Sequence, residues 1–398
     1  MSRRRSFSPP PRSKTPPRRC GTVDMGEARR PLIAVALAGA LLGSGLLLVA
    51  VTGAYNIAAS EGHWRITEIL LRFGLERSVS VRANETPPRL DDPDLIRLGA
   101  GHFHAACAPC HGAPGTPVPA FVGGMLPTPP DLRTRVDAWS DAELFRIIRH
   151  GIKYTGMPAW PSRGTEREIW AVTAFVRHMH RLDAAAYQAL ARGGATMSAA
   201  DGTASGSGRN LPDGVAACAH CHGAQGQQPS SALVPTLYGQ PEAMLRAALR
   251  SYAQRTRPSG VMQVAVDGLS PRQLDQLAAY YAAIAPPVPQ PPTPDQMPLV
   301  EAGRVLAEHG DAAARIPACL SCHGPQALPL YPRLAGQSAR YLEGRLDGWR
   351  HGAQARGDAL DRVMAPIARR LSEEQARALA AFFAQQAPHA AQARADGL

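Results

Sequence analysis

Cys107-Ala-Pro-Cys110-His111 is the first of three pentapeptides of one kind in this chain, and the motif decides how the rest is interpreted. The others are Cys218-Ala-His-Cys221-His222 and Cys319-Leu-Ser-Cys322-His323, so six of the 7 cysteines lie in these motifs. Cys-x-x-Cys-His is the attachment signal of haem c, in which both thiols bond to the porphyrin and the histidine ligates the iron. The pattern therefore predicts three covalently bound haem c groups.

A zinc site and a thiol redox pair are the alternatives to haem. Cys-x-x-Cys pairs bind zinc or exchange disulfides in other proteins. A zinc ion would need a second pair of ligands near each motif, and no further cysteine follows within reach in sequence. Neither alternative requires a histidine directly after every pair, so haem attachment is favoured.

One methionine stands at a similar distance after each motif and is the candidate sixth ligand of the iron. Met157 lies 46 residues after the first motif histidine, Met262 lies 40 after the second and Met364 lies 41 after the third. A thioether ligand raises the reduction potential of a haem and closes its iron to small substrates. Core packing is the alternative role of each methionine. Met125 and Met244 are possible substitutes that break the register.

Helix-start signals support this register. Eight residues after each methionine begins a Ser/Thr-x-x-Glu/Gln capping box, which satisfies free N–H groups at a helix N-terminus. The boxes begin at Thr165, Ser270 and Ser372. The helices that follow match at offsets 4, 7 and 10, positions on one helical face. The matched residues are Ile169, Leu274 and Ala376, then Val172, Leu277 and Leu379, then Phe175, Tyr280 and Phe382. The chain therefore repeats one helical module.

The basic charge of the chain is concentrated in its first thirty residues. That segment has nine basic residues against two acidic ones, so it carries +7 of the formal net charge of +11. The propionates of three haems would offset the charge of the remainder. The high isoelectric point therefore belongs to a proline-rich tail, and nucleic acid is not expected as a partner.

Pro31 to Val51 is a run of 21 residues without a charge. About 20 apolar residues span a bilayer as a helix. Because the basic residues precede the run, we expect the tail in the cytoplasm and the haem modules in the periplasm, anchored in the bacterial inner membrane. A cleaved signal peptide is the rival interpretation, although its apolar core is usually only about 7–15 residues long. The amphipathic segment from His63 to Ala83 either lies on the membrane surface or packs on the first haem module.

Composition changes and proline clusters predict the domain boundaries. The first module opens with Gly99 and Phe103 on one helix face, which permits a close helix crossing. The second lacks a strong apolar helix before its motif, so its haem edge is exposed or a helix from residues 183–190 covers it. The expected segments are a basic tail (1–30), an anchor (31–54), an amphipathic juxtamembrane segment and linker (55–93), a first cytochrome domain (94–182), a flexible linker (183–206), a second domain (207–285), a Pro-rich linker (286–298), a third domain (299–386) and a C-terminal tail (387–398).

Residues 207–386 resemble the dihaem cytochrome c4 family. The markers are the glycine after each motif, the late methionine, and Pro235-Thr-Leu-Tyr-Gly-Gln240, which aligns with Pro332-Arg-Leu-Ala-Gly-Gln337. The resemblance implies that Pro235 and Pro332 each supply a carbonyl that orients a proximal histidine. Tyr55-Asn-Ile-Ala-Ala59, Glu76-Arg-Ser-Val79 and the segment from Gly151 to Trp160 mark residues 55–190, which resemble membrane-anchored monohaem cytochromes. The Met157-Pro-Ala-Trp160 segment of this chain also resembles one in the cytochrome subunits of periplasmic alcohol and sugar-acid dehydrogenases.

We expect a mainly α-helical protein with one N-terminal transmembrane helix and three class I cytochrome c domains. Its expected function is electron transfer, without catalysis, between a donor and an acceptor such as a dehydrogenase, a quinol-oxidising complex or a terminal oxidase. The nearest alternative is the cytochrome subunit of a periplasmic dehydrogenase of the alcohol or sugar-acid type. A haem that lacks its methionine and acts as a peroxidase or gas-binding site is a second alternative, and an assembly factor with structural haem is a third.

Overall fold

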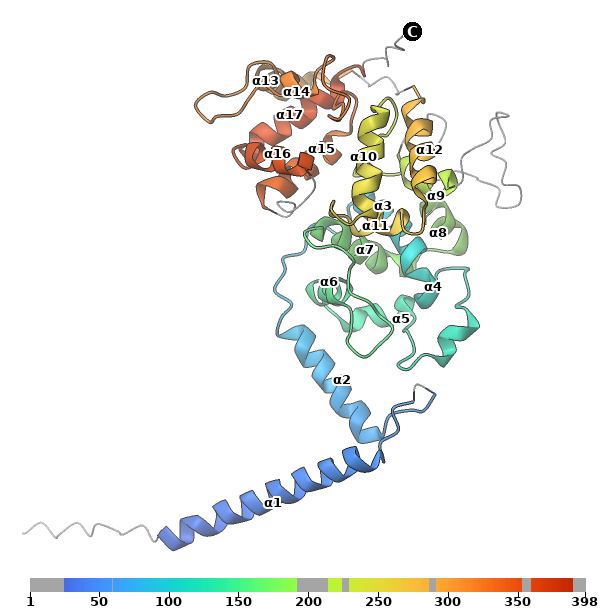
Figure 1. Cartoon of the computed structure of the whole chain (residues 1–398), viewed down its shortest axis with the longest axis vertical. Coiled ribbons are helices and arrows are strands. Elements are labelled where there is room, and N and C mark those ends of the chain that lie inside the picture. Colours follow the sequence, from blue (N-terminus) through green and yellow to red (C-terminus); the bar gives the residue numbers. More distant parts are fainter. Residues whose placement is uncertain are drawn as a thin grey trace, which may run out of the picture. The chain divides into compact units, whose positions relative to one another are not determined.

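The computed structural model describes residues 25–58, 60–191, 214–223, 229–285, 291–352 and 359–388. Helices joined by turns and loops make up these residues, and no β-strand occurs among them, so the prediction of a mainly helical fold is confirmed (Figure 1). The chain divides into two units, residues 1–61 and 62–398. Most of the basic tail, residues 192–206 of the first linker, residues 286–290 of the Pro-rich linker and residues 389–398 of the C-terminal tail lie outside the described residues.

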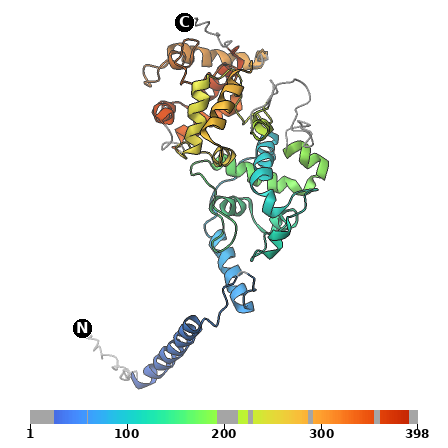
Figure 2. The same cartoon turned by 45° about the vertical axis from the view of Figure 1, so that its right-hand side comes forward.

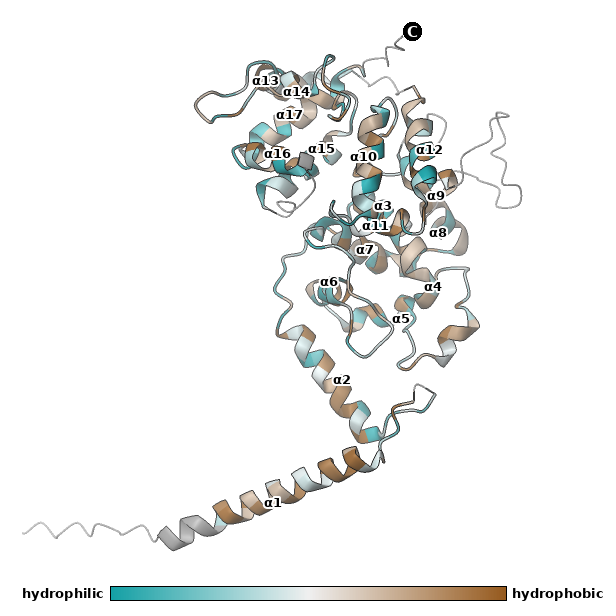
Figure 3. Ribbon diagram, viewed as in Figure 1, coloured by the Kyte–Doolittle hydropathy of each residue, from teal (hydrophilic) through white to brown (hydrophobic). Residues whose placement is uncertain are grey.

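The first unit contains one long helix, α1 (Met25–Thr52). Its segment Pro31–Thr52 has 22 residues with a mean hydropathy of 2.5 and no buried residue. Figure 3 shows this apolar character along the helix. The length and composition suit a bilayer-spanning anchor, and a signal sequence would have the same properties.

In the second unit, the first module is built on two crossed helices. Its helices are α2 (Arg65–Ser80), α3 (Pro93–Ala106), α4 (Ala108–His111), α5 (Leu132–Arg135), α6 (Asp141–His150), α7 (Glu166–His178) and α8 (Ala184–Ala191), with 3-10 turns at Ala120–Gly124, Val136–Ala138 and Met179–Arg181. α3 crosses α7 at Gly99, where a Cβ atom would lie 1.9 Å from the carbonyl oxygen of Ala171. Phe103 and Phe175 are fully buried beside this crossing. The crossing thus requires glycine, as the sequence indicates.

Residues 184–191 were expected to be part of a flexible linker, but they form α8. Tyr187 and Ala191 of this helix are buried in the core of the first module. The hydroxyl of Tyr187 lies 2.8 Å from Nδ1 of His104 on α3. The sequence here is rich in alanine, which favours a helix whatever the helix packs against.

The third module repeats the crossing. Its helices are α13 (Met297–His309), α14 (Leu320–His323), α15 (Ala339–Arg350), α16 (Ala359–Ala368) and α17 (Glu373–Gln385), preceded by a 3-10 turn at Pro294–Gln296. α13 crosses α17 at Gly303, where a Cβ atom would lie 2.0 Å from the carbonyl oxygen of Ala378. Phe382 and Phe383 are buried at this crossing.

The second module contains α9 (Val215–His222), α10 (Glu242–Ala253), α11 (Gly260–Ala265) and α12 (Pro271–Ala282). α10 packs along α12, as Figures 1 and 2 both show. α3 of the first module contacts α9. A Cβ atom on Gly101 of α3 would lie 2.8 Å from Nε2 of His220, inside the second motif. A helix of the first module therefore packs against the helix that carries the second motif, and α8 packs on α3.

The capping boxes form at two of the three expected positions. Ser270 with Gln273 and Ser372 with Gln375 make both hydrogen bonds of the box. The prediction at Thr165 is wrong, because the Thr165 side chain makes no cap hydrogen bond. The hydroxyl of Thr165 instead accepts a hydrogen bond from Nε1 of Trp160 at 2.9 Å.

Candidate functional site

Each Cys-x-x-Cys-His motif lies on one helical turn. The histidine N–H donates to the carbonyl of the first cysteine four residues earlier, at 3.0 Å for His111 and 2.9 Å for His323. In the second motif, the whole sequence lies within α9. Residues at positions i, i+3 and i+4 of a helix share one face. The turn therefore presents two thiols and one imidazole on the same side, which suits one porphyrin with its iron.

The three motif histidines share one hydrogen bond. Nδ1 of His111 lies 3.0 Å from the carbonyl oxygen of Pro130. The Nδ1 distance is 2.9 Å from His222 to the carbonyl of Pro235 and 2.9 Å from His323 to that of Pro332. Because a carbonyl can only accept, Nδ1 carries the proton and Nε2 keeps its lone pair for a metal. Such a partner orients the imidazole and tunes the iron that it binds.

Pro130 is a partner that sequence reasoning missed. The proline lies 19 residues after the histidine in the first module, against 13 and 9 residues in the others. A short signal could have found it, because Pro130-Asp-Leu132 shares Pro-x-Leu with the two segments already aligned. The varying spacing hid the match.

Cys107, Cys218 and Cys319 each pack against the apolar core of their own module. Burial raises the pKa of Cys107 and Cys221 to about 12 and that of Cys218 and Cys319 to about 11. Redox-active Cys-x-x-Cys pairs have a lowered thiol pKa, so the direction is opposite to that of a thiol oxidoreductase. The zinc alternative needs four ligands, and the described residues contain no group of three or more His, Cys, Asp or Glu side chains that could hold a metal ion.

The candidate ligands of the second and third modules line one continuous cavity of about 1280 Å³. Its walls include Cys218, Cys221, His222, Met262, Cys319, Cys322, His323 and Met364. Drug-sized ligands occupy pockets of about 300–1,000 Å³, so this cavity has room for more than one large group. Its remaining walls are mostly apolar, among them Leu245, Leu277 and Phe383. The residues present therefore fit two haem groups.

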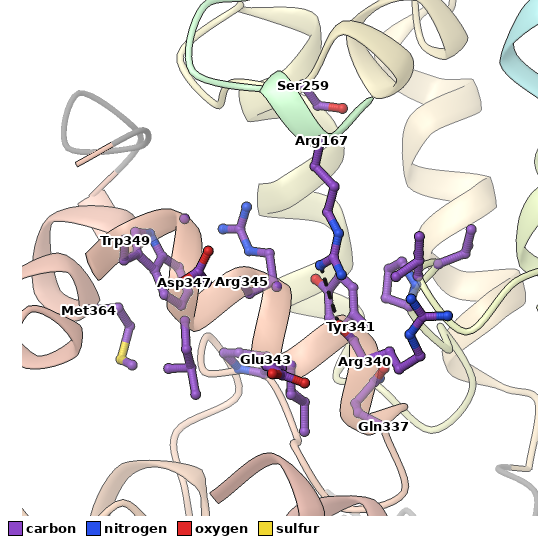
Figure 4. A pocket seen from close by; sticks show the side chains of 18 of the residues that line it. Arg167, Ser259, Gln337, Arg340, Tyr341, Glu343, Arg345, Asp347, Trp349 and Met364 are labelled. Atoms are coloured by element: carbon purple, nitrogen blue, oxygen red, sulfur yellow. Dashed lines mark hydrogen bonds between the residues drawn. The ribbon is translucent and has the colours of Figure 1, made fainter. Parts of the chain in front are cut away.

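Figure 4 shows one side of this cavity. Met364 lies near Trp349 of α15, and Arg167 extends from α7 of the first module toward Arg340 and Tyr341. Nη1 of Arg167 donates to the carbonyl oxygen of Arg340 at 3.4 Å. All three modules therefore contribute to the wall of one cavity.

The three candidate methionines are placed in different ways. Met262 and Met364 lie on α11 and α16 and line the cavity, as does the possible substitute Met244. Met157 lies outside this cavity, in the loop between α6 and α7. The first motif also lies outside the cavity. That loop folds on itself: the N–H of Ile152 donates to the Met157 carbonyl at 3.2 Å, and the N–H of Met157 donates to Oγ1 of Thr155 at 3.1 Å. Met125 packs beside Gly156 of the same loop.

A reciprocal pair of glutamines joins the second and third modules. Oε1 of Gln337 accepts from the N–H of Thr236 at 3.0 Å, and Oε1 of Gln240 accepts from the N–H of Arg333 at 3.0 Å. Nε2 of Gln337 also donates to the carbonyl of Thr236 at 2.5 Å, and Nε2 of Gln240 donates to the carbonyl of Arg333 at 2.8 Å. Thr236 and Arg333 directly follow the prolines that hold the motif histidines. Each module therefore fastens the histidine-binding loop of the other.

The first module contacts both other modules around Asp94. The N–H of Ala232 donates to Asp94 of α3 at 3.1 Å, and its carbonyl accepts from Ser338 at 2.6 Å. Arg340 adds ion pairs to Asp94 at 2.6 Å and to Asp92. Its hydrogen bond lowers the pKa of Asp92 to about 2. The three modules therefore share polar contacts as well as the cavity wall.

The crossed helices, the Cys-x-x-Cys-His turns and the imidazole–carbonyl bonds together define a c-type cytochrome. Residues 94–176 match the family model described as cytochrome c oxidase, cbb3-type, subunit III, and residues 302–387 match that described as cytochrome c. The chain belongs to the multihaem cytochromes c that include dihaem cytochrome c4 and the thiosulfate dehydrogenase electron acceptors. Cytochromes of this kind carry covalently bound haem c and transfer electrons.

Two relatives show the extent of the match. A thiosulfate dehydrogenase electron acceptor of Thiomonas intermedia is 38% identical over 178 residues, which cover 44% of this chain and 81% of the relative. A cytochrome c4 of Azotobacter vinelandii is 32% identical over 42% of this chain and 84% of its own. Among solved structures, cytochrome c4 from Pseudomonas stutzeri is 28% identical and covers 43% of this chain and 94% of its own, with a TM-score of 0.38.

Proposed function

We propose that this chain is a membrane-tethered, periplasmic cytochrome c that carries electrons through three covalently bound haems, each ligated by one histidine and one methionine. The observation that carries the proposal is the repeated bond between a motif histidine and a proline carbonyl, since all three motifs have it. The proposed ligand pairs are His111 with Met157, His222 with Met262 and His323 with Met364.

The haem supplies a one-electron exchange between ferric and ferrous iron when it is bound. The residues of this chain hold the ligands still. The carbonyl of Pro235 fixes the ring of His222, and Gln337 in turn fixes the backbone of Thr236 beside that proline. Leu277 and Tyr281 wall the same cavity and are almost fully buried, so they keep water from it. Ligands that do not move between oxidation states favour electron transfer over catalysis.

The number of haems is tested by the mass of the purified chain after expression with haem-attachment machinery. We expect three haem additions per chain and two after Cys107→Ala is combined with Cys110→Ala. Replacing Cys20, which lies in no motif, is the matched control and should leave three. A wild-type chain that carries only two haems would contradict the proposal.

Membrane attachment is proposed from two segments, each taken by itself. α1 is long and apolar enough to span a bilayer, and the basic residues before it favour a cytoplasmic N-terminus. α2 exposes apolar side chains, with Ile66, Leu70 and Phe73 each about 60% accessible. An amphipathic helix of this kind suits the membrane surface. Alkaline carbonate extraction should leave the full chain with the membranes, and release of the intact chain would contradict an anchor.

We propose a thiosulfate dehydrogenase in the periplasm as the electron donor. The similarity to an electron acceptor of thiosulfate dehydrogenase supports this assignment over an alcohol or sugar-acid dehydrogenase. The test mixes the oxidised cytochrome with a purified thiosulfate dehydrogenase and thiosulfate and follows haem reduction by stopped-flow absorbance. We expect reduction that depends on enzyme and substrate. Reduction by a quinoprotein alcohol dehydrogenase with ethanol, and none by the thiosulfate enzyme, would favour the other class.

A further inference from the structure

Glu168 of the first module is bound to the second module. The sequence places it as the last residue of a capping box, yet its carboxylate accepts from Oγ of Ser259 at 2.5 Å and from the N–H of Gly260 at 2.7 Å. These partners lie 91 and 92 residues away along the chain. Ser259 and Gly260 are both buried.

The segment that Glu168 holds leads directly to the candidate ligand of the second haem. Ser259 is the N-cap of α11, and its hydroxyl oxygen accepts from the N–H of Met262 at 3.0 Å. The path from the first module to the backbone of this methionine therefore consists of two hydrogen bonds in series. An N-cap fixes the first turn of its helix, which in α11 is the turn that carries Met262.

Trp160 presses on the same segment from the first module. A Cβ atom added to Gly260 would lie 2.1 Å from Nε1 of this indole. The indole is held in turn by its hydrogen bond to Thr165. Trp160 ends the Met157-Pro-Ala-Trp160 segment. The loop that carries the first candidate methionine therefore contacts the turn that carries the second.

The electrostatics suit a fastening role. A carboxylate is stabilised at the N-terminus of a helix by its free N–H groups and its dipole. Burial raises the pKa of Glu168, and the hydrogen bonds from Ser259 and Gly260 oppose that effect. A buried carboxyl group is unfavourable unless it is hydrogen-bonded, and both of its oxygens are bonded here.

We propose that Glu168 is a positioning residue that holds Met262 on the iron of the second haem, so that the ligation of this haem depends on the first module. The proposal rests on the proposed His/Met ligation of the second haem. Without Glu168, the Ser259 hydroxyl and the Gly260 N–H lose their acceptor, and the first turn of α11 is free to shift. The Met262–iron bond then weakens, the reduction potential of the second haem falls and its sixth position opens to carbon monoxide.

The test compares four variants of the haem-loaded full chain. Glu168→Ala removes both acceptor oxygens. Glu168→Gln keeps one acceptor for Gly260 and an amide that can donate to Ser259. Glu166→Ala is the matched control, because Glu166 lies in the same helical turn and pairs with Arg149 inside the first module. Met262→Ala marks the second haem. Carbon monoxide binding to the reduced protein and an optical redox titration are measured for each, with haem content checked first.

We expect wild type, Glu166→Ala and Glu168→Gln to exclude carbon monoxide. Glu168→Ala should bind it at one haem in three, and that haem should be the one whose potential Met262→Ala lowers. Glu168→Ala with three unchanged potentials and no carbon monoxide binding would overturn this inference alone, as would a change at another haem. If Met262→Ala leaves every haem unchanged, the ligand assignment itself fails, and the inference fails with it.

Discussion

Gln337→Ala in the third module should disturb the haem of the second module. Gln337 makes two hydrogen bonds to the backbone of Thr236, at 3.0 Å and 2.5 Å. Both residues are buried, with exposed fractions of 5% and 6%. Thr236 follows Pro235, whose carbonyl orients His222. Alanine removes the donor and the acceptor at once and leaves the buried N–H and C=O of Thr236 without these partners.

The magnitude follows from these two groups. A buried backbone group that loses its partner costs about 1–3 kcal/mol. Water that enters the space left by the side chain recovers part of this free energy. We expect Gln337→Ala to lower the free energy of unfolding by about 2–4 kcal/mol. The freed loop should also let the His222 ring turn, so the potential of the second haem should change more than that of the third.

Gln240→Ala is the mirror variant, because Gln240 makes the same pair of bonds to Arg333 beside Pro332. It should change the potential of the third haem more than that of the second. Optical redox titration measures both potentials, with Met262→Ala and Met364→Ala marking the haems, and denaturant unfolding measures stability. If each glutamine variant changes only the haem of its own module, the crossed arrangement is refuted.

Three further predictions concern packing and pH. Gly99→Ala should destabilise the chain by about 1–3 kcal/mol through overpacking, since its Cβ would meet a carbonyl of α7. Gly74→Ala in α2, where the space is open, should stabilise by about 0.5–1 kcal/mol; equal thermal shifts in the two variants would refute the helix crossing. Burial lowers the pKa of His102 from 6.5 to about 4, so its contribution to stability is complete above pH 6.5 and is lost as the pH falls toward 4. His102→Phe should flatten unfolding free energy against pH in that window, and an unchanged slope would count against a buried neutral imidazole. The Arg340 hydrogen bond lowers the pKa of Asp92 from 3.8 to about 2, so its stabilisation is complete above pH 3.8 and is lost between 3.8 and 2. Asp92→Asn should remove about 1 kcal/mol of stability at neutral pH and little at pH 2, and an equal loss at both values would exclude the ion pair as its cause.

Features that depend on residues close together in the sequence could be predicted. The three attachment turns follow from pentapeptides, and the two capping boxes at Ser270 and Ser372 follow from four-residue patterns. Gly99 indicated a close helix crossing because small residues at such a position have few other uses. Nine residues occupy the matching offsets 4, 7 and 10 in the three helices, and eight of them are buried. The exception is Tyr280, whose place in the core is taken by Tyr281.

Features that depend on contacts between modules could not be predicted. Thr165-Glu-Arg-Glu168 satisfies the capping pattern, but a partner 91 residues away competes for the glutamate. Local spacing says nothing about such a partner. The sequence lacks a strong apolar run before Cys218, yet nothing in it showed that α3 of the first module would pack against α9.

An optical redox titration of the haem-loaded full chain, with carbon monoxide added to the reduced state, tests the central claim most directly. The account predicts three haems per chain, all at positive potentials because each has a thioether ligand, and none that reacts with carbon monoxide. A haem of low potential that binds carbon monoxide in the wild-type chain would contradict three closed His/Met sites and would favour a catalytic or gas-binding role for that haem.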